Sequence, residues 1–152
     1  MSKNQCVSNL AEISISYSPK VKASDRQKIR CSEEMEKIAR SIFPSIEHRE
    51  FFYLICLDRS NNVLGYHQVS VGGITGTVAD VRIIFQTALK ANSSGIIITH
   101  NHPSGNTAPS DTDRLLTNKI KEAGKLLDIP VLDHLILTEE SYLSFADEGF
   151  LQ

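Results

Sequence analysis

Apolar residues are grouped in short blocks along the chain, and the lengths and periods of these blocks predict strands and helices. Near-continuous apolar runs, typical of strands buried on both faces, occupy residues 50–58, 95–99 and 131–137. A further strand, residues 63–71, follows the first run after the turn signal Asn61-Asn62. Alternation of apolar residues with serine predicts a half-buried strand over residues 11–17, and a short strand is expected near residues 142–145.

Three other segments repeat their apolar residues at a helical period, so we expect one side of each helix to pack on the sheet. The segments are residues 33–43, 78–91 and 110–127. Expected inward side chains include Leu89 in the second segment, and Leu115 and Leu127 in the third. Each segment is preceded or opened by a hydroxyl residue suited to capping its first turn: Ser32, Thr77 and Ser110.

Strands that alternate with helices predict an α/β fold, in which helices cover the faces of one sheet. The hairpin at Asn61 makes that sheet mixed rather than purely parallel. A length of 152 residues fits a single domain. We therefore expect a flexible N-terminal tail over residues 1–10 and one domain over residues 11–152.

Composition narrows the range of partners and compartments. With 16 basic and 18 acidic side chains, the net charge is −2, which gives no basic excess for binding nucleic acid. The three cysteines form no C-x-x-C pair, the N-terminus lacks an apolar signal core, and no apolar run is long enough to span a membrane. The sequence thus predicts a cytoplasmic protein with no membrane partner, and contact with DNA only through a local patch.

The loop after the strand at residues 95–99 concentrates candidate chemistry in the string T-H-N-H-P-S-G-N-T-A-P-S-D-T-D. His100 and His102 are two residues apart in extended chain, so both imidazoles point to one face. Asp113 lies at the start of the next predicted helix, where its carboxylate can turn back towards them. Two histidines and one carboxylate leave a coordination position open, as catalytic zinc sites do.

Each part of this pattern also has a purely structural explanation. Ser110 and Asp113 have the spacing of a capping box ahead of an apolar helix. Pro103, Gly105 and Pro109 are residues that commonly shape a loop. The combination of both patterns at a fixed distance is much more specific than either alone, and it favours a metal site.

The spacing H-x-H, seven residues, serine, two residues, aspartate resembles the JAMM signature of the JAB/MPN metallopeptidase superfamily. The strings H-N-H-P-S-G-N and P-S-D-T-D are similar to its RadC branch. The likeness continues in E-F-F-Y-L-I-C-L-D from Glu50 and in L-D-I-P-V-L-D-H-L-I from Leu127. It covers residues 12–151, nearly the whole chain.

The resemblance implies a JAB/MPN, cytidine-deaminase-like architecture and a zinc-dependent hydrolase that cleaves amide bonds in a peptide or protein substrate. It implies that His100, His102 and Asp113 bind Zn²⁺. It also implies that Glu50 acts as the general base and that Ser110 stabilises the oxyanion.

One departure from the family pattern keeps other functions open. Long RadC proteins carry an N-terminal helix-hairpin-helix region, and this chain has 49 residues before Glu50 without a Gly-centred hairpin, so we expect a short form. One alternative is a protein associated with DNA repair or mobile elements that binds DNA or protein without peptidase activity. Another is a metal-bearing module that binds a peptide along a sheet edge near residues 72–77. His134, within the strand at 131–137, is expected to be structural.

Overall fold

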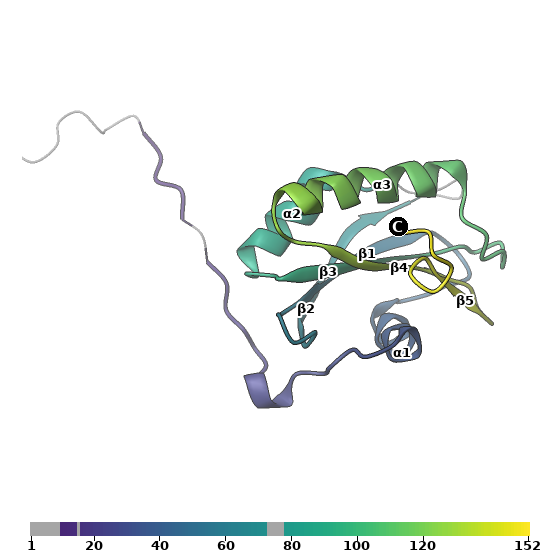
Figure 1. Ribbon diagram of the computed structural model, residues 1–152, viewed down its shortest axis with the longest axis horizontal. Coiled ribbons are helices and arrows are strands. Elements are labelled where there is room, and N and C mark those ends of the chain that lie inside the picture. Colours follow the sequence, from purple (N-terminus) through teal and green to yellow (C-terminus); the bar gives the residue numbers. More distant parts are fainter. Residues whose placement is uncertain (1–9, 15, 73–77) are drawn as a thin grey trace, which may run out of the picture.

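The computed structural model describes residues 10–14, 16–72 and 78–152, and these residues form one mixed sheet with helices on both faces (Figure 1). The strands are β1 (Phe51–Leu57), β2 (Val63–Val71), β3 (Gly95–Asn101), β4 (Val131–Leu137) and β5 (Tyr142–Ser144). The helices are α1 (Ser32–Ile42), α2 (Val81–Lys90) and α3 (Asp111–Leu126), with a short 3₁₀ turn, η1 (Ala23–Asp25), before them. The predicted α/β class with a mixed sheet is confirmed.

The strand order is β2-β1-β3-β4-β5. β1 pairs antiparallel with both β2 and β3, β3 pairs parallel with β4, and β4 pairs antiparallel with β5. β3 is therefore the middle strand, held by a neighbour along each side. Its parallel pairing with β4 requires a crossover, and α3 provides that crossover.

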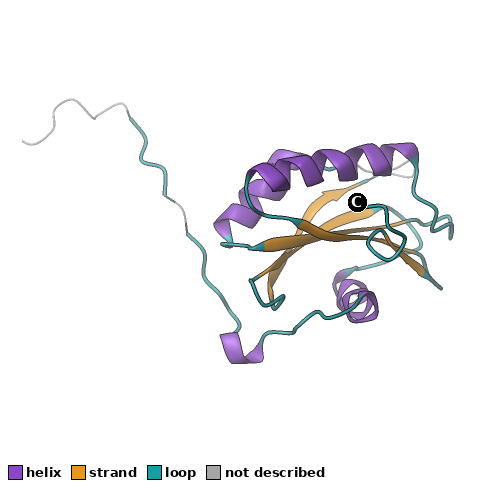
Figure 2. Ribbon diagram, viewed as in Figure 1, coloured by secondary structure: helices purple, strands orange, loops and turns teal. Residues whose placement is uncertain are grey.

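The sheet separates two apolar cores (Figure 2). α2 and α3 lie on one face and bury Ile84, Phe85 and Ile120 against alternate residues of β1 and β3. α1 lies on the other face, where Met35 and Ala39 pack on the intervening residues of the same strands. Strands buried on both faces explain the near-continuous apolar runs in the sequence.

Most predicted elements are confirmed to within a few residues, and β2 and β4 have the predicted bounds. β3 continues two residues beyond its prediction, to Asn101. Helix α2 starts later than predicted because the Asp80 carboxylate caps it by accepting from the backbone N–H of Arg82. The predicted cap Thr77 lies outside the described residues. Ser32 is the first residue of α1 and makes no side-chain cap.

Three side chains expected to face inward are instead on the surface. Leu89, Leu115 and Leu127 are 52%, 71% and 39% exposed. The helical period correctly places their neighbours Ala88, Leu116 and Ala123 towards the core, but the buried stripe is narrower than the apolar stripe in the sequence. None of the helices in the described ranges combines the length and apolar character needed to cross a bilayer.

The predicted strand over residues 11–17 is wrong for the residues that the structure describes. They are exposed and join no sheet, and a single hydrogen bond from the Tyr17 hydroxyl to the carbonyl of Leu64 links this segment to β2. A segment with alternating apolar residues forms a strand only where a neighbouring strand supplies backbone hydrogen bonds. Among the described residues, β2 does not pair with this segment. The first described apolar side chain that is buried is Ile29, so the packed core begins there.

Gly124, in the last turns of α3, lies close to the backbone of Ile129, just before β4. A Cβ atom at this position would overlap the backbone carbonyl oxygen of Ile129. The glycine is thus required by packing, although glycine ordinarily weakens a helix.

We predict that Gly124→Ala lowers the free energy of unfolding by about 1–3 kcal/mol, as overpacking does, instead of raising it as the helix propensity of alanine would. Gly65→Ala on β2 is the control, because a Cβ there meets no atom within 4 Å. Urea denaturation of both variants measures the difference. Equal stability of Gly124→Ala and the parent protein would contradict the close approach.

Candidate metal centre

The three predicted ligands converge where β3 ends and α3 begins, on either side of the loop that lies at the right in Figure 1. His100 is the penultimate residue of β3, and His102 follows the strand directly. Their side chains lie on the α2/α3 face, because Ile98 two residues earlier belongs to that core. Asp113 is in the first turn of α3. We call these three residues the His-His-Asp cluster.

The ligand atoms of the cluster are close enough to share one ion. The Nε2 atoms of His100 and His102 are 3.0 Å apart, and each lies 3.3 Å from one carboxylate oxygen of Asp113. Two ligands at the usual zinc distances, seen at a tetrahedral angle, are separated by roughly 3.3 Å. The donor set fits a divalent ion that accepts nitrogen and oxygen ligands. Across the described ranges, no other group of His, Cys, Asp or Glu side chains has this property.

Hydrogen bonds leave the Nε2 atom of both imidazoles facing the cluster. The Nδ1 of His102 is 2.7 Å from the backbone carbonyl of Asn106, which can only accept, so this nitrogen carries the hydrogen. The Nδ1 of His100 is 2.7 Å from the Nε2 of His134. The ring of Phe52 stacks on His100, with centroids 5.8 Å apart.

Charge in the cluster favours an ionised carboxylate. Burial alone would raise the pKa of the Asp113 carboxyl, but the adjacent imidazoles of His100 and His102 and the hydrogen bond from the Ser110 N–H hold it well below its usual value. The adjacent Asp113 carboxylate, which stabilises the protonated imidazole, raises the pKa of His102 against the lowering by partial burial. The carboxylate therefore provides the negative charge that a divalent cation needs in a half-buried site.

Ser110 and Asp113 also form the capping box that the sequence allows. The Ser110 Oγ accepts from the Asp113 N–H at 3.1 Å, and the Asp113 carboxylate accepts from the Ser110 N–H at 2.8 Å. The structural explanation of this motif, a capping box, is thus confirmed, and the same Asp113 side chain belongs to the His-His-Asp cluster. The cap uses the Ser110 oxygen as an acceptor and leaves its hydroxyl hydrogen available to a ligand.

Glu50 directly precedes β1, one strand away from the histidines. Its backbone carbonyl accepts from the N–H of Gly72, and the residue is half-buried. Phe52, two residues later, is opposite His100 in the β1–β3 ladder. Continued by two residues, this antiparallel register sets the backbone of Glu50 opposite His102, and the negative charge of Glu50 contributes to the raised pKa of His102.

Asn101, between the two histidines, holds the segment that leads into β1. Its buried side chain points to the opposite face and donates to the carbonyls of Ile46 and Arg49, both at 2.8 Å. Its amide oxygen accepts from the N–H of Phe51 at 2.7 Å. Three hydrogen bonds thus fix the backbone on both sides of Glu50 relative to the cluster.

His134 was expected to be a structural histidine, and its ring is fully buried between the rings of His100 and Phe145, which agrees with that expectation. Its contact with His100 was not predicted. Burial lowers its pKa well below the usual value for histidine. Strand alternation in residues 131–137 predicts that His134 and Leu135 point to opposite faces of the sheet. It does not predict which residue of β3 lies beside His134, because one sequence does not determine the pairing register.

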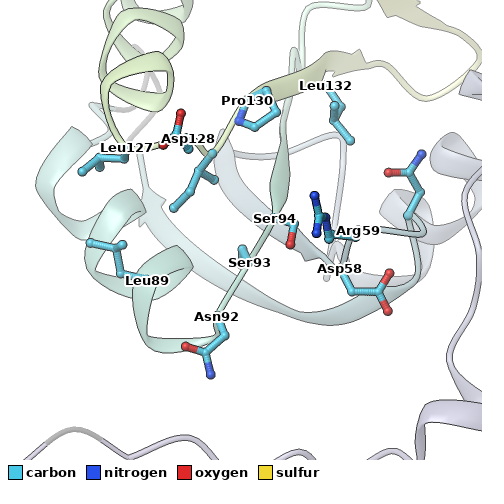
Figure 3. Close-up of a pocket in the computed structure, with 12 residues that line it drawn as sticks. Asp58, Arg59, Leu89, Asn92, Ser93, Ser94, Leu127, Asp128, Pro130 and Leu132 are labelled. Carbon is cyan, nitrogen blue, oxygen red and sulfur yellow. The ribbon is translucent and has the colours of Figure 1, made fainter.

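A separate hollow of about 740 Å³ lies at the other end of β3 (Figure 3). Its lining comes from the β1–β2 turn, the ends of α2 and α3, and the start of β4, and includes Asp58, Ser94 and Asp128. β3 is seven residues long, so roughly 20 Å separates this hollow from the cluster. None of the predicted site residues lines it.

Comparisons with known proteins find a matching family model and several relatives. A family model described as RadC-like JAB domain matches residues 29–150. A UPF0758 protein of Flavobacterium johnsoniae is 46% identical over 123 residues, which are 81% of this chain and 53% of that protein. A UPF0758 protein of Thermotoga maritima is 38% identical over 133 residues, 80% of this chain and 60% of that protein. The chain spans about half the length of the curated relatives it matches.

We predict that Asn101→Ala lowers the free energy of unfolding by about 2–4 kcal/mol, because it leaves one buried N–H and two carbonyls without their partner. Asn106→Ala is the control, since its exposed side chain accepts only from the Ala108 N–H. Chemical denaturation compares the two. A similar small loss in both variants would show that the Asn101 hydrogen bonds do not fix this segment.

Proposed function

This chain belongs to the family of RadC-like JAB domain proteins, and we propose that its His-His-Asp cluster binds zinc and supports hydrolysis of amide bonds in a peptide or protein. The observation that carries the proposal is the spacing of 3.0–3.3 Å among two imidazole nitrogens and two oxygens of one carboxylate. Three protein ligands are typical of catalytic zinc, which keeps a position for water, whereas structural zinc has four.

Zinc, when bound, supplies Lewis acidity that lowers the pKa of water and polarises a carbonyl. The residues of this chain supply the rest of the reaction. Glu50 takes a proton from the attacking water and returns it to the leaving amine nitrogen. The hydroxyl hydrogen of Ser110, which the capping box leaves available, donates to the developing oxyanion.

A protein substrate agrees better with the charge of the molecule than DNA does. The net charge is −2, so the chain as a whole has no electrostatic attraction for a phosphate backbone. The negative charges of Glu50 and Asp113 balance the two positive charges of a zinc ion, so the loaded site offers a phosphate backbone no excess of positive charge. Hydrolysis of an amide, whose scissile group is neutral, suits this environment.

The proposal predicts one zinc ion per chain by elemental analysis of the zinc-loaded protein. His102→Ala should lose most of this metal, because it removes one of three ligands, whereas the exposed His48→Ala should keep it. A parent protein that retains no zinc after loading and gel filtration would overturn the proposal.

Glu50→Gln should keep the metal and lose hydrolysis, by about 100-fold or more, because the amide cannot carry the proton. Glu47→Gln, an exposed neighbour, is the matched control. Cleavage of a proteome-derived peptide library, followed by mass spectrometry, measures the activity. The role of Glu50 is refuted if Glu50→Gln cleaves as fast as the parent protein.

A further inference from the structure

A chain of hydrogen bonds extends from His100 away from the proposed metal position into the core. The Nδ1 of His100 is 2.7 Å from the Nε2 of His134 in β4. The Nδ1 of His134 is 2.6 Å from the Oγ1 of Thr117 in α3. That hydroxyl in turn donates to the backbone carbonyl of Asp113 at 2.6 Å. The side chains of His100, His134 and Thr117 are all buried, so water does not compete for their hydrogen bonds.

The donor and acceptor roles in this series of hydrogen bonds follow from its last acceptor, the backbone carbonyl of Asp113. The carbonyl of Asp113 can only accept, so the hydroxyl hydrogen of Thr117 points to it. The Thr117 oxygen is then an acceptor for His134, whose hydrogen must be on Nδ1. This leaves the Nε2 of His134 as an acceptor for the Nδ1–H of His100. The lone pair of His100 is consequently on Nε2, the atom that faces the cluster.

We propose that Thr117 and His134 are positioning residues that set the tautomer of His100, so that its Nε2 is ready to bind the metal. The inference rests on the proposed function and extends it to two residues that touch no ligand atom of the ion. We call the two residues the Thr117–His134 relay. His102 needs no relay, because the carbonyl of Asn106 fixes its tautomer directly.

The relay is needed because a neutral histidine has two tautomers, and either ring nitrogen can carry the hydrogen and act as the donor. Without the Thr117 hydroxyl, His134 can carry its hydrogen on Nε2 and donate to the Nδ1 of His100. The hydrogen of His100 would then be on Nε2, where it blocks metal binding. Phe145 stacks on His134 with centroids 4.5 Å apart, and Phe52 stacks on His100, so the ring planes are held while the hydrogens can exchange.

Thr117→Val tests the relay because it keeps the shape of the side chain and removes only the hydroxyl. We expect its zinc affinity to fall by about 10–100-fold, the usual cost of losing the outer partner of a metal-binding histidine. Thr117→Ser, which restores the hydroxyl, should recover most of the affinity. Thr87→Val is the matched control, because Thr87 makes the same bond to the carbonyl four residues back, in α2. Competition with a chromophoric zinc chelator measures each dissociation constant.

The tautomer itself provides a second readout that a merely structural role would not move. Nitrogen-15 NMR of the zinc-free protein should show the hydrogen of His100 on Nδ1 in the parent protein and in Thr117→Ser. In Thr117→Val the population with the hydrogen on Nε2 should increase. His134→Gln, which offers an oxygen to the Nδ1–H of His100, should bind zinc more tightly than His134→Leu, which offers none.

The outcomes separate this inference from the proposed function. If the parent protein binds no zinc, the proposed function fails, and the zinc-free NMR measurement still decides whether the relay sets the tautomer. If the parent protein binds zinc and Thr117→Val has the same affinity and the same His100 tautomer, the relay is refuted. Equal loss of affinity in Thr117→Val and Thr117→Ser would also refute it, because packing rather than the hydroxyl would be responsible.

Discussion

Side chains of a β-strand point alternately to the two faces of the sheet, and the candidate site depends on this alternation at the end of β3. His100 and His102 point to the α2/α3 face, where Asp113 meets them. Asn101, between them, points to the α1 face and holds the backbone next to Glu50. Because β3 pairs with β1 and β4 along its two sides, it cannot shift its register without disrupting the whole sheet. Three consecutive residues therefore hold the His-His-Asp cluster and the backbone next to Glu50 in a fixed relative position.

The start of α3 shows that a stabilising motif and a chemical one can use the same atoms. Asp113 closes the capping box with Ser110, and its two oxygens face the two histidines. The helix start thus fixes the carboxylate before any ion arrives. The positive end of the helix dipole also favours the ionised form of this side chain. Little reorganisation is needed on binding, which is the condition for a tight metal site built from only three ligands.

Local patterns in the sequence were sufficient for the fold and for the His-His-Asp cluster. The apolar runs predict β1, β3 and β4, and the H-x-H and Ser-x-x-Asp spacings predict which side chains converge. The failures concern features set by distant partners. Residues 11–17 have a strand pattern but no strand to pair with, among the described residues.

The same reason explains why the Thr117–His134 relay was missed. His134 faces His100 only because β4 lies beside β3 with one particular register, and Thr117 reaches it only because α3 crosses that pair. The spacing of His100, Thr117 and His134 along the sequence does not predict that their side chains meet. A histidine next to Asp133 in a mostly apolar strand was the available signal, and a satisfied core histidine produces the same signal.

The contact between Gly124 and Ile129 has a consequence for the opposite end of α3. Asp113 lies eleven residues before Gly124 in this helix, at a distance of roughly 16 Å along its axis. A side chain at Gly124 that pushed this rigid helix away from the sheet would also tilt its first turn, and with it the Asp113 carboxylate. The packing at the far end of α3 is thus mechanically connected to the spacing within the His-His-Asp cluster.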